Sequence, residues 1–368
     1  MQIVFVYFWL DFDGDTLKDR PLGGVETSIV IMAKELAKLG FSVTVFNKCS
    51  RPGVYDGVIY SNTEKLQDYL LTNNIDILIE VRSATILGCG GLRIKRRIFW
   101  SGDPIVFFDE ARKNLRRSAV QSVIDKYFFV SKWQANSYQQ NYNLEINKIF
   151  VTRNGFEKEL IDEKNIEACD HRMIYASVPD RGLALLEHIF PLIKKTVPEA
   201  ELHVFSGYEH YQMNEADIKR VIGDLFVRLS KIDGVFLHKV VSRKELMAEF
   251  KNSSFLIYPC TALETSCMVA IEAQACGIPV LASSLGGLPE TVQDGKTGII
   301  VPGSPESQDF ITKFAEEAIK LIQDKELRDD LGANAKKRMF DNYQWTKIAK
   351  EWEAVLSNIL QLSEVKHN

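Results

Sequence analysis

Short apolar runs alternate with amphipathic stretches along the first half of the chain. Ile3–Leu10 is an apolar run of eight residues that Asp11 ends, which predicts a buried parallel β-strand. From Val25 to Leu39 the apolar residues recur at the spacing of one helical stripe, and Gly40 is well placed to end that helix. Further strand candidates are Phe41–Phe46, Ile75–Ile79, Ile98–Trp100, Tyr127–Val130 and Ile149–Thr152. This alternation predicts a parallel sheet covered by helices.

The second half of the chain repeats the pattern. Its strand candidates are Met173–Ala176, Glu201–Phe205, Val235–His238, Phe255–Tyr258, Val280–Ser283 and Gly298–Val301. A capping box of Ser242 and Glu245 predicts a helix start, and a last helix is expected from near Thr346 towards Leu362. The polar stretch Glu157–His171 breaks the alternation and is the candidate linker. The pattern therefore predicts an α/β fold of two doubly wound domains that face each other across a cleft.

Composition and charge narrow the class of protein. Hydrophobic residues make up 46% and charged residues 26% of the 368 residues, as in a well-cored globular protein. The net charge is −4, so no overall positive field points to nucleic acid. No segment reaches the ~18 uninterrupted apolar residues of a spanning helix, and Ile3–Leu10 lacks the charged start of a signal peptide. The six cysteines form no CxxC pair, which is typical of reduced thiols, so we expect a cytoplasmic protein.

The strongest candidate for chemistry is a pair of carboxylates, Glu264 and Glu272, that follows the strand Phe255–Tyr258. A helix that begins near Ser266 would place Glu272 about two turns inside it. Eight residues at ~1.5 Å rise span about 12 Å, comparable to the distance from the hexose to the ribose of a nucleotide sugar. One carboxylate would then accept sugar hydroxyls and the other ribose hydroxyls, while the free N–H groups of the helix start would face the diphosphate. The alternative is two solvated glutamates at a helix end.

Two glycines, Gly23 and Gly24, precede the first helix, where they would let the backbone approach an anion. A plain turn is the alternative. A nicotinamide dinucleotide site is not indicated, because no GxGxxG motif follows the first strand. The second strand also ends at Asn47 without an acidic ligand for a ribose.

Further polar positions follow predicted strands, at the edge where open α/β sheets bind ligands. Arg181 lies in the turn Pro179–Gly182, and its guanidinium would form paired hydrogen bonds with phosphate oxygens. Ser206 and Gly207 end the next strand, and Asp103 follows a strand of the first half, where its carboxylate would face the cleft. For Arg181 and Asp103 the alternative is a surface turn with a solvated side chain.

A basic stretch in the first half consists of two runs, Arg93–Arg97 and Arg112–Arg117. No aromatic stacking platform interleaves it, so single-stranded nucleic acid is not expected. It would suit an anionic membrane or an acidic acceptor, and a solvated protein surface is the alternative. We expect no metal site, because Cys169 and His171 have no second pair of ligands at a suitable spacing.

Taken together and in order, these segments resemble the retaining GT-B glycosyltransferases of family 4 (glycosyl transferases group 1), over nearly the whole chain. The residues that carry the resemblance are Gly23-Gly24-Val25-Glu26, Pro179-Asp180-Arg181-Gly182, Glu264-x7-Glu272, Ala273–Val280, Gly286-Gly287-Leu288-Pro289-Glu290 and Asp294–Gly298. The resemblance implies two Rossmann-like domains that close on a nucleotide-sugar donor, with no required metal or other cofactor. It implies an acceptor-binding domain at 1–156, a nucleotide-sugar-binding domain at 157–345, and a C-terminal helix at 346–368 that crosses back onto the first domain.

The family's roles carry over to the matching positions of this sequence. The resemblance implies that Glu272 holds the donor ribose and that Glu264 contacts the donor sugar. Arg181 stands where the family usually has a phosphate-binding lysine. The backbone groups implied to line the donor are those of Gly24, Ser266, Cys267, Met268 and Val269 at the diphosphate, and those of Val240 and Val241 at the base.

The sequence departs from the family pattern at three places. Ala176-Ser177-Val178 is uncharged where the family often has an additional arginine, so phosphate neutralisation would rest on Arg181 and helix dipoles. Ser266-Cys267 stands in place of a Phe-Gly pair. Gly102 stands where the family often has a histidine, which leaves Asp103 as the candidate catalytic residue of the first domain. The candidate catalytic residues of the second domain are Glu264 and Arg181.

The expected function is transfer of a sugar, of the hexosyl type, from a UDP or GDP sugar to an acceptor hydroxyl with retention at the anomeric carbon. The expected acceptor is a carbohydrate or a lipid-linked glycan, in the synthesis of a polysaccharide, a glycolipid or another glycan. The basic runs would allow peripheral contact with the inner face of the membrane. A nucleotide-sugar 2-epimerase of the same architecture and a degenerate, non-catalytic partner subunit are the alternatives.

Overall fold

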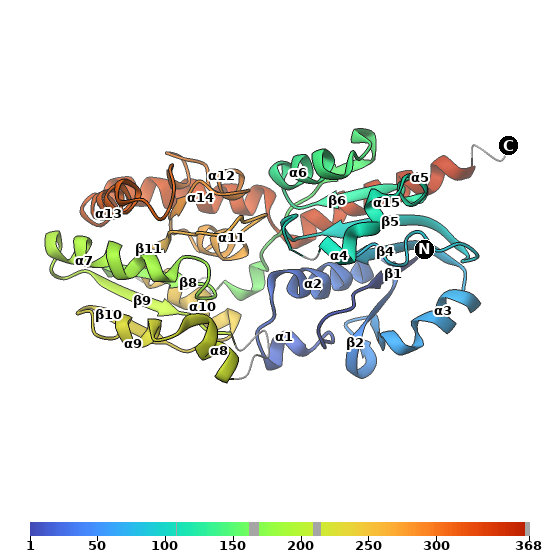
Figure 1. Cartoon of the computed structure of the whole chain (residues 1–368), viewed down its shortest axis with the longest axis horizontal. Helices are drawn as coiled ribbons and strands as arrows, with labels where there is room; N and C mark the ends of the chain where they lie inside the picture. The colour runs from blue at the N-terminus through green and yellow to red at the C-terminus, as the bar shows by residue number, and fades with distance from the viewer. Residues whose placement is uncertain (108, 162–168, 209–214, 365–368) are drawn as a thin grey trace. The chain divides into compact units, whose positions relative to one another are not determined.

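The computed structural model describes residues 1–107, 109–161, 169–208 and 215–364 (Figure 1). The chain forms two compact units, Met1–Asn154 together with Trp345–Asn368, and Gly155–Gln344. Each unit contains one β-sheet of mostly parallel strand pairs, and helices connect most of the successive strands. The predicted α/β class with two doubly wound domains is confirmed.

The first unit is built on a seven-stranded sheet in the order β3-β2-β1-β4-β5-β6-β7. Its strands are β1 (Gln2–Val6), β2 (Ser42–Tyr55), β3 (Val58–Asn62), β4 (Ile75–Val81), β5 (Ile94–Ser101), β6 (Lys126–Phe129) and β7 (Ile149–Val151). Its helices are α1 (Thr16–Asp19), α2 (Gly24–Lys38), α3 (Leu66–Thr72), α4 (Asp109–Arg112), α5 (Ser118–Val123), α6 (Lys132–Tyr142) and α15 (Trp345–Glu364). The order reverses between β1 and β4, which is where open sheets of this kind bind ligands, at the carboxyl ends of the strands.

The second unit has a six-stranded sheet in the order β10-β9-β8-β11-β12-β13, which repeats the arrangement of the first. Its strands are β8 (Cys169–Ala176), β9 (Glu201–Phe205), β10 (Val235–His238), β11 (Ser253–Tyr258), β12 (Val280–Ser283) and β13 (Gly298–Val301). Its helices are α7 (Leu186–Thr196), α8 (Glu215–Ile222), α9 (Leu225–Leu229), α10 (Arg243–Lys251), α11 (Met268–Ala275), α12 (Leu288–Thr291), α13 (Gln308–Gln323) and α14 (Lys325–Asn342). The capping box predicted at Ser242 and Glu245 is present at the start of α10.

Among the boundaries that differ from the sequence-based prediction are the end of β1 and the start of β8. β1 ends at Val6, not at Leu10, because only Tyr7 still donates a backbone hydrogen bond to the sheet, at Phe46, before the chain leaves it. β8 begins at Cys169, inside the stretch predicted as a linker, because its first residues pair with Ser253 at the start of β11. Residues 162–168 of that stretch lie outside the described residues.

The C-terminal helix α15 returns to the first unit, as predicted. It packs against α2 and β5. Trp352 on its inner face is 1% exposed and meets the rings of Trp100 and Phe128 edge-on, with centroids 4.9 and 4.7 Å away. The indole N–H of Trp352 donates to the hydroxyl of Thr152 at 2.8 Å. One aromatic side chain therefore joins the last helix to two strands and to the end of β7.

Replacing Trp352 with alanine is expected to lower the free energy of unfolding by about 3–5 kcal/mol, the usual cost of deleting a buried aromatic side chain. Chemical denaturation of the full chain measures this. Lys350→Ala is the matched control, because Lys350 lies exposed on the same helix. Equal stability of both variants would show that the contacts of Trp352 add little to the stability of the first unit.

The basic runs are not a uniform surface. Arg112 is fully buried, where it donates to the hydroxyl of Tyr138 and to the carbonyl of Pro104. Arg96 donates to the carbonyl of Ile359 in α15 and to Asp125. The expectation that these two arginines face a membrane is therefore wrong, since both hold the first unit together. None of the helices in the described part of the chain combines the length and apolar character that crossing a bilayer requires.

Candidate functional site

Glu264 lies in the loop between β11 and α11, at the carboxyl edge of the second sheet. Its side chain is 16% exposed. Its carboxylate atom Oε1 accepts a hydrogen bond from the hydroxyl of Tyr258 at 2.8 Å and lies 3.7 Å from Nε of Arg181. The Tyr258 hydroxyl is fully buried, and burial, followed by the charge of Glu264, raises its pKa well above the ordinary value. Tyr258 therefore remains a hydrogen-bond donor and fixes one oxygen of Glu264.

Two glycines hold the backbone of Glu264 from the neighbouring loop after β12. The N–H of Gly287 donates to the Glu264 carbonyl at 2.5 Å. Gly286 has a φ of +63°, and a Cβ at this position would overlap the same carbonyl oxygen. Only glycine combines this backbone conformation with such close contact. The Gly286-Gly287 pair thus sets the position of Glu264.

Arg181 reaches Glu264 from a tight turn at the end of β8. The N–H of Arg181 donates to the carbonyl of Val178 at 3.1 Å. The next residue, Gly182, has a φ of +93°, and a Cβ there would overlap the carbonyl of Pro259, which follows β11. This contact brings the turn against the loop that carries Glu264.

The guanidinium of Arg181 keeps its hydrogen-bonding capacity. Within the described residues its side chain makes the 3.7 Å ion pair with Glu264 and donates no hydrogen bond. Burial works against the charge of Arg181, but Glu264 and other nearby groups outweigh burial and raise its pKa above the ordinary value. The turn therefore presents a permanent positive charge whose N–H groups are available to an anion.

Glu272 lies on α11, one turn inside the helix. The helix begins at Met268 with Cys267 as its N-cap, two residues later than predicted, so Glu272 is about 6 Å from the helix start at ~1.5 Å per residue. The later start follows from Cys267, whose backbone is extended and whose side chain lies in the core. Glu272 is 6% exposed, and its Oε1 atom accepts two hydrogen bonds from Arg243, at 3.1 and 2.7 Å.

The remaining positions predicted in the second unit lie at the same sheet edge. Ser206 donates from its hydroxyl to the carbonyl of Ser177 at 2.6 Å, so it ties the end of β9 to the end of β8. Gly207 follows it, and the next residue, Tyr208, donates to Asp180 beside Arg181 at 3.3 Å. Val240 and Val241 form the half-exposed connection from β10 to α10.

The structure thus brings the predicted donor residues of the second unit to the carboxyl ends of β8, β9, β10 and β11. These residues are Arg181, Ser206, Gly207, Val240, Val241, Glu264, Ser266, Cys267, Met268, Val269 and Glu272. Cys267 and Met268 form the start of α11, where backbone N–H groups favour an anion.

The predicted residues of the first unit lie at the carboxyl edge of its own sheet. Gly23 is the N-cap of α2 and Gly24 is the first helical residue. Asp103 follows β5 and is 9% exposed, because Arg82 at the end of β4 donates to both of its carboxylate oxygens, at 2.6 and 3.1 Å. Arg82 has a φ of +71°, a conformation that costs energy for an arginine and persists only where the surrounding structure holds it.

Arg82 also connects Asp103 to two further side chains, Tyr7 and Glu26, through hydrogen bonds. It donates to the hydroxyl of Tyr7 at 2.9 Å, and Tyr7 donates to Glu26 on the first turn of α2. Burial, together with the charge of Glu26, raises the pKa of Tyr7 above its ordinary value. Asp103 is therefore not a solvated turn residue, because it belongs to a buried hydrogen-bonded group.

Sequence reasoning missed three residues of these sites: Tyr258, Arg243 and Arg82. Tyr258 was assigned only to a strand, although a hydroxyl at the last position of a buried strand requires a partner. Arg243 and Arg82 were missed because their partners lie 29 and 21 residues away in the sequence. No local sequence signal marks either arginine, because its burial and its partner follow from the strand order and helix packing of its unit.

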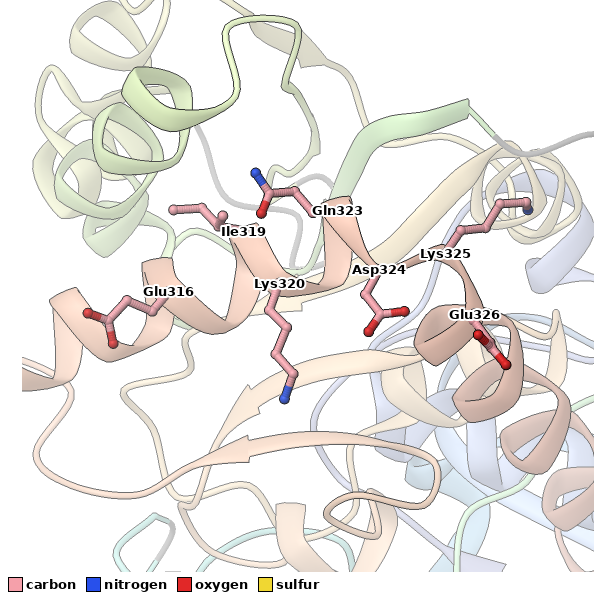
Figure 2. A pocket seen from close by; sticks show the side chains of 7 residues that line it. All are labelled: Glu316, Ile319, Lys320, Gln323, Asp324, Lys325 and Glu326. Atoms are coloured by element: carbon pink, nitrogen blue, oxygen red, sulfur yellow. The ribbon is translucent and has the colours of Figure 1, made fainter.

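A separate groove runs along α13 and the start of α14 (Figure 2). It is lined by Glu316, Ile319, Lys320, Gln323, Asp324, Lys325 and Glu326. Most of these side chains are exposed, and none of them is a predicted site residue. The groove therefore adds nothing to the candidate site.

Comparisons with known proteins find that this chain is similar to glycosyltransferases. Residues 157–338 match the family model for glycosyl transferases group 1. The capsular polysaccharide biosynthesis glycosyltransferase CapM of Staphylococcus aureus is 30% identical over 229 residues, which is 59% of this chain and 56% of that protein. A GDP-mannose-dependent phosphatidylinositol monomannoside mannosyltransferase of Mycolicibacterium smegmatis is 29% identical over 51% of this chain and 47% of its own length. The chain thus spans about half the length of these curated relatives.

Solved structures match almost the whole chain. The sucrose-phosphate synthase of Thermosynechococcus elongatus superimposes with a TM-score of 0.73 at 16% identity, covering 98% of this chain and 99% of that one. HepE of Anabaena in complex with UDP-glucose gives a TM-score of 0.72 at 17% identity, covering 97% of this chain and 100% of that one. At these identities the likeness shows the fold, which is that of the GT-B glycosyltransferases.

Proposed function

We propose that this chain, in which residues 157–338 match the family model for glycosyl transferases group 1, transfers a sugar from a nucleoside-diphosphate sugar to an acceptor hydroxyl. The acceptor would be a carbohydrate or a lipid-linked glycan. The observation that carries the proposal is the arrangement at the start of α11, where Glu264 and Glu272 lie on either side of the helix N-terminus and Arg181 lies beside Glu264. This arrangement offers acceptors for hydroxyls at both ends and donors for an anion between them.

The proposed donor lies along α11 in the second unit. Glu272 accepts a hydrogen bond from the ribose, and Glu264 accepts hydrogen bonds from the sugar through the oxygen that Tyr258 leaves open. Arg181 and the backbone from Ser266 to Val269 contact the diphosphate. Val240 and Val241 contact the base, and Ser206 and Gly207 line the sugar side.

In the proposed reaction the bond between the anomeric carbon and the diphosphate oxygen breaks, so the diphosphate gains negative charge. Arg181 and the start of α11 stabilise that charge where it develops, which lowers the barrier. The acceptor hydroxyl attacks from the face that the diphosphate leaves, and the departing phosphate takes its proton. This course retains the configuration at the anomeric carbon and uses no enzymic nucleophile, metal or other cofactor.

In the first unit, Asp103 is the proposed contact for the acceptor. The bidentate hydrogen bonds from Arg82 fix its carboxylate, so it offers an acceptor of set orientation at the carboxyl edge of the sheet. Gly23 and Gly24, at the start of α2, are the proposed backbone contacts of this unit for an anion.

UDP and GDP sugars are the donors to test, because HepE was solved with UDP-glucose and the Mycolicibacterium relative uses GDP-mannose. The full chain, incubated with a panel of these donors and a mixture of glycan acceptors, is expected to release UDP or GDP only when an acceptor is present. Release of a donor isomer without any acceptor would instead indicate an epimerase. Analysis of the product by NMR reports whether the anomeric configuration is retained.

Glu264→Ala is expected to lower turnover about 100-fold while leaving the affinity for the free nucleoside diphosphate unchanged. The reason is that Glu264 contacts the sugar, whose misplacement costs rate, but not the nucleotide. Glu316→Ala is the control, because Glu316 is an exposed glutamate of α13. Full turnover of the Glu264→Ala variant would remove Glu264 from the site.

A further inference from the structure

Arg243 connects Glu272 of the candidate donor site to Glu157, which lies near the start of the second unit. It is the first residue of α10, directly after the capping residue Ser242. Its side chain is 14% exposed and lies between Glu272 on α11 and Glu157. Three elements that are distant in the sequence therefore meet at one guanidinium.

The hydrogen bonds of Arg243 use one oxygen of Glu272 and leave the other open. Nε and Nη2 of Arg243 both donate to Oε1, at 3.1 and 2.7 Å. Nη1 donates to Oε2 of Glu157. Within the described residues nothing donates to the Oε2 atom of Glu272. The carboxylate is thus held at one oxygen, and the second is available to a hydroxyl donor.

The two carboxylates of Glu157 and Glu272 need a positive charge between them, and Arg243 supplies it. The side chain of Glu272 is 7% exposed and that of Glu157 is 26% exposed, so two carboxylates would lie close together in a poorly solvated place without Arg243. A buried carboxylate without a partner takes up a proton or moves towards water. Burial works against the charge of Arg243 itself, but Glu272 and Glu157 outweigh it and raise the pKa of Arg243.

Glu157 is a fixed partner for Arg243. The residue before it, Phe156, donates its backbone N–H to the carbonyl of Tyr343 at 2.9 Å. The ring of Phe156 is buried against Phe340, with ring centroids 5.1 Å apart. The segment that carries Glu157 is therefore held by the end of α14, and it holds the guanidinium from the side opposite Glu272.

We propose that Arg243 is a positioning residue for the ribose of the donor: its two hydrogen bonds hold Oε1 of Glu272, so that Oε2 accepts a hydrogen bond from a ribose hydroxyl. The proposal rests on the proposed function, since it assigns a residue to the same nucleotide site. Arg243 does not touch the nucleotide, and its effect passes through Glu272.

The test compares binding of a nucleoside diphosphate with binding of its 2′,3′-dideoxy form by calorimetry, in the wild type, Arg243→Met and Lys244→Met. UDP and GDP are the probes. The wild type is expected to bind the ribose form about 10- to 100-fold more tightly, the range for a hydrogen bond to a charged group. In Arg243→Met this ratio is expected to fall to about 1, because the affinity for the ribose form drops and that for the dideoxy form does not. Lys244, the next residue of α10, is exposed, so its variant keeps the wild-type ratio.

The ratio of the two affinities separates positioning from a general structural role, because a loosened fold would weaken the binding of the ribose form and of the dideoxy form alike. A wild-type ratio in Arg243→Met would overturn the positioning role and leave the proposed function standing. A wild type that binds neither UDP nor GDP would overturn the proposed function, and the positioning role with it. Arg243→Gln, which keeps a polar side chain, replaces Arg243→Met if the methionine variant does not fold, with the same expected loss of the ratio.

Discussion

Arg181→Ala is expected to lower kcat by about 10²- to 10³-fold, the usual loss when one donor to a developing negative charge is removed from an enclosed site. Arg181 is charged, and within the described residues its side chain donates no hydrogen bond, so its N–H groups are available to the leaving diphosphate. The preceding residues Ala176-Ser177-Val178 carry no charge that would compensate. Steady-state rates of nucleoside diphosphate release, at saturating donor, measure the loss.

Two further variants make this prediction specific. Arg181→Lys keeps the positive charge but not the paired geometry, so we expect it to recover part of the rate. Arg220→Ala removes an arginine that is 80% exposed on α8 and is expected to retain the wild-type rate. If Arg181→Ala matched the wild type, the diphosphate would not lie beside this turn.

Gly286→Ala is expected to lower donor-dependent turnover about 100-fold or more. The new methyl group would overlap the carbonyl oxygen of Glu264, which accepts the N–H of Gly287 and cannot move without displacing the loop. A shift of about 1 Å in a group that orients the substrate costs on the order of 10²-fold in rate. Turnover and the melting temperature are measured on the same sample.

Gly295→Ala is the control that separates the effect of the steric overlap with Glu264 from the effect of backbone strain. Gly295 has a φ of +65°, nearly that of Gly286, but no atom lies within 4 Å of a Cβ at this position. Both variants therefore carry the same backbone cost of about 1–2 kcal/mol, and only Gly286→Ala displaces Glu264. Equal turnover of the two variants would show that the close contact with Glu264 does not matter for the reaction.

The strands of the second sheet were well predicted because each is a short apolar run between turn residues. β9, β10, β12 and β13 have the predicted bounds at both ends. β5 is longer than predicted, since Arg96 and Arg97 lie within it, and their charges hid the strand. Those charges are tolerated because Asp125 accepts hydrogen bonds from the side chain of Arg96 and the backbone of Arg97.

The edge of the first sheet was the part of the fold that the periodicity did not predict. β2 runs to Tyr55, well past the predicted end at Phe46, and β3 follows after two residues. Asp56 and Gly57 both have positive φ, at 49° and 79°, and Tyr55 pairs with Val58 across them. An Asp-Gly pair between strands is a strong hairpin signal, and attention to it would have found this element.

The candidate site was predictable as far as its residues follow strands. The carboxyl ends of parallel strands share one edge, so Arg181 after β8 and Glu264 after β11 were expected to lie together, and they do. What the sequence could not supply is which side chains orient these groups. The partners of Glu272 and Asp103 are Arg243 and Arg82, which reach them only through the strand order and the helix packing of each unit.

The most direct measurement of the central claim is a calorimetric titration of the wild type and of Arg181→Ala with UDP and with GDP. We expect the wild type to bind one of the two nucleotides at a ratio of one per chain. Arg181→Ala should bind the same nucleotide at least about 10-fold more weakly, since a charge-assisted hydrogen bond is lost. Absence of heat with both nucleotides, or equal affinity in the two proteins, would contradict a donor site at the carboxyl edge of the second sheet.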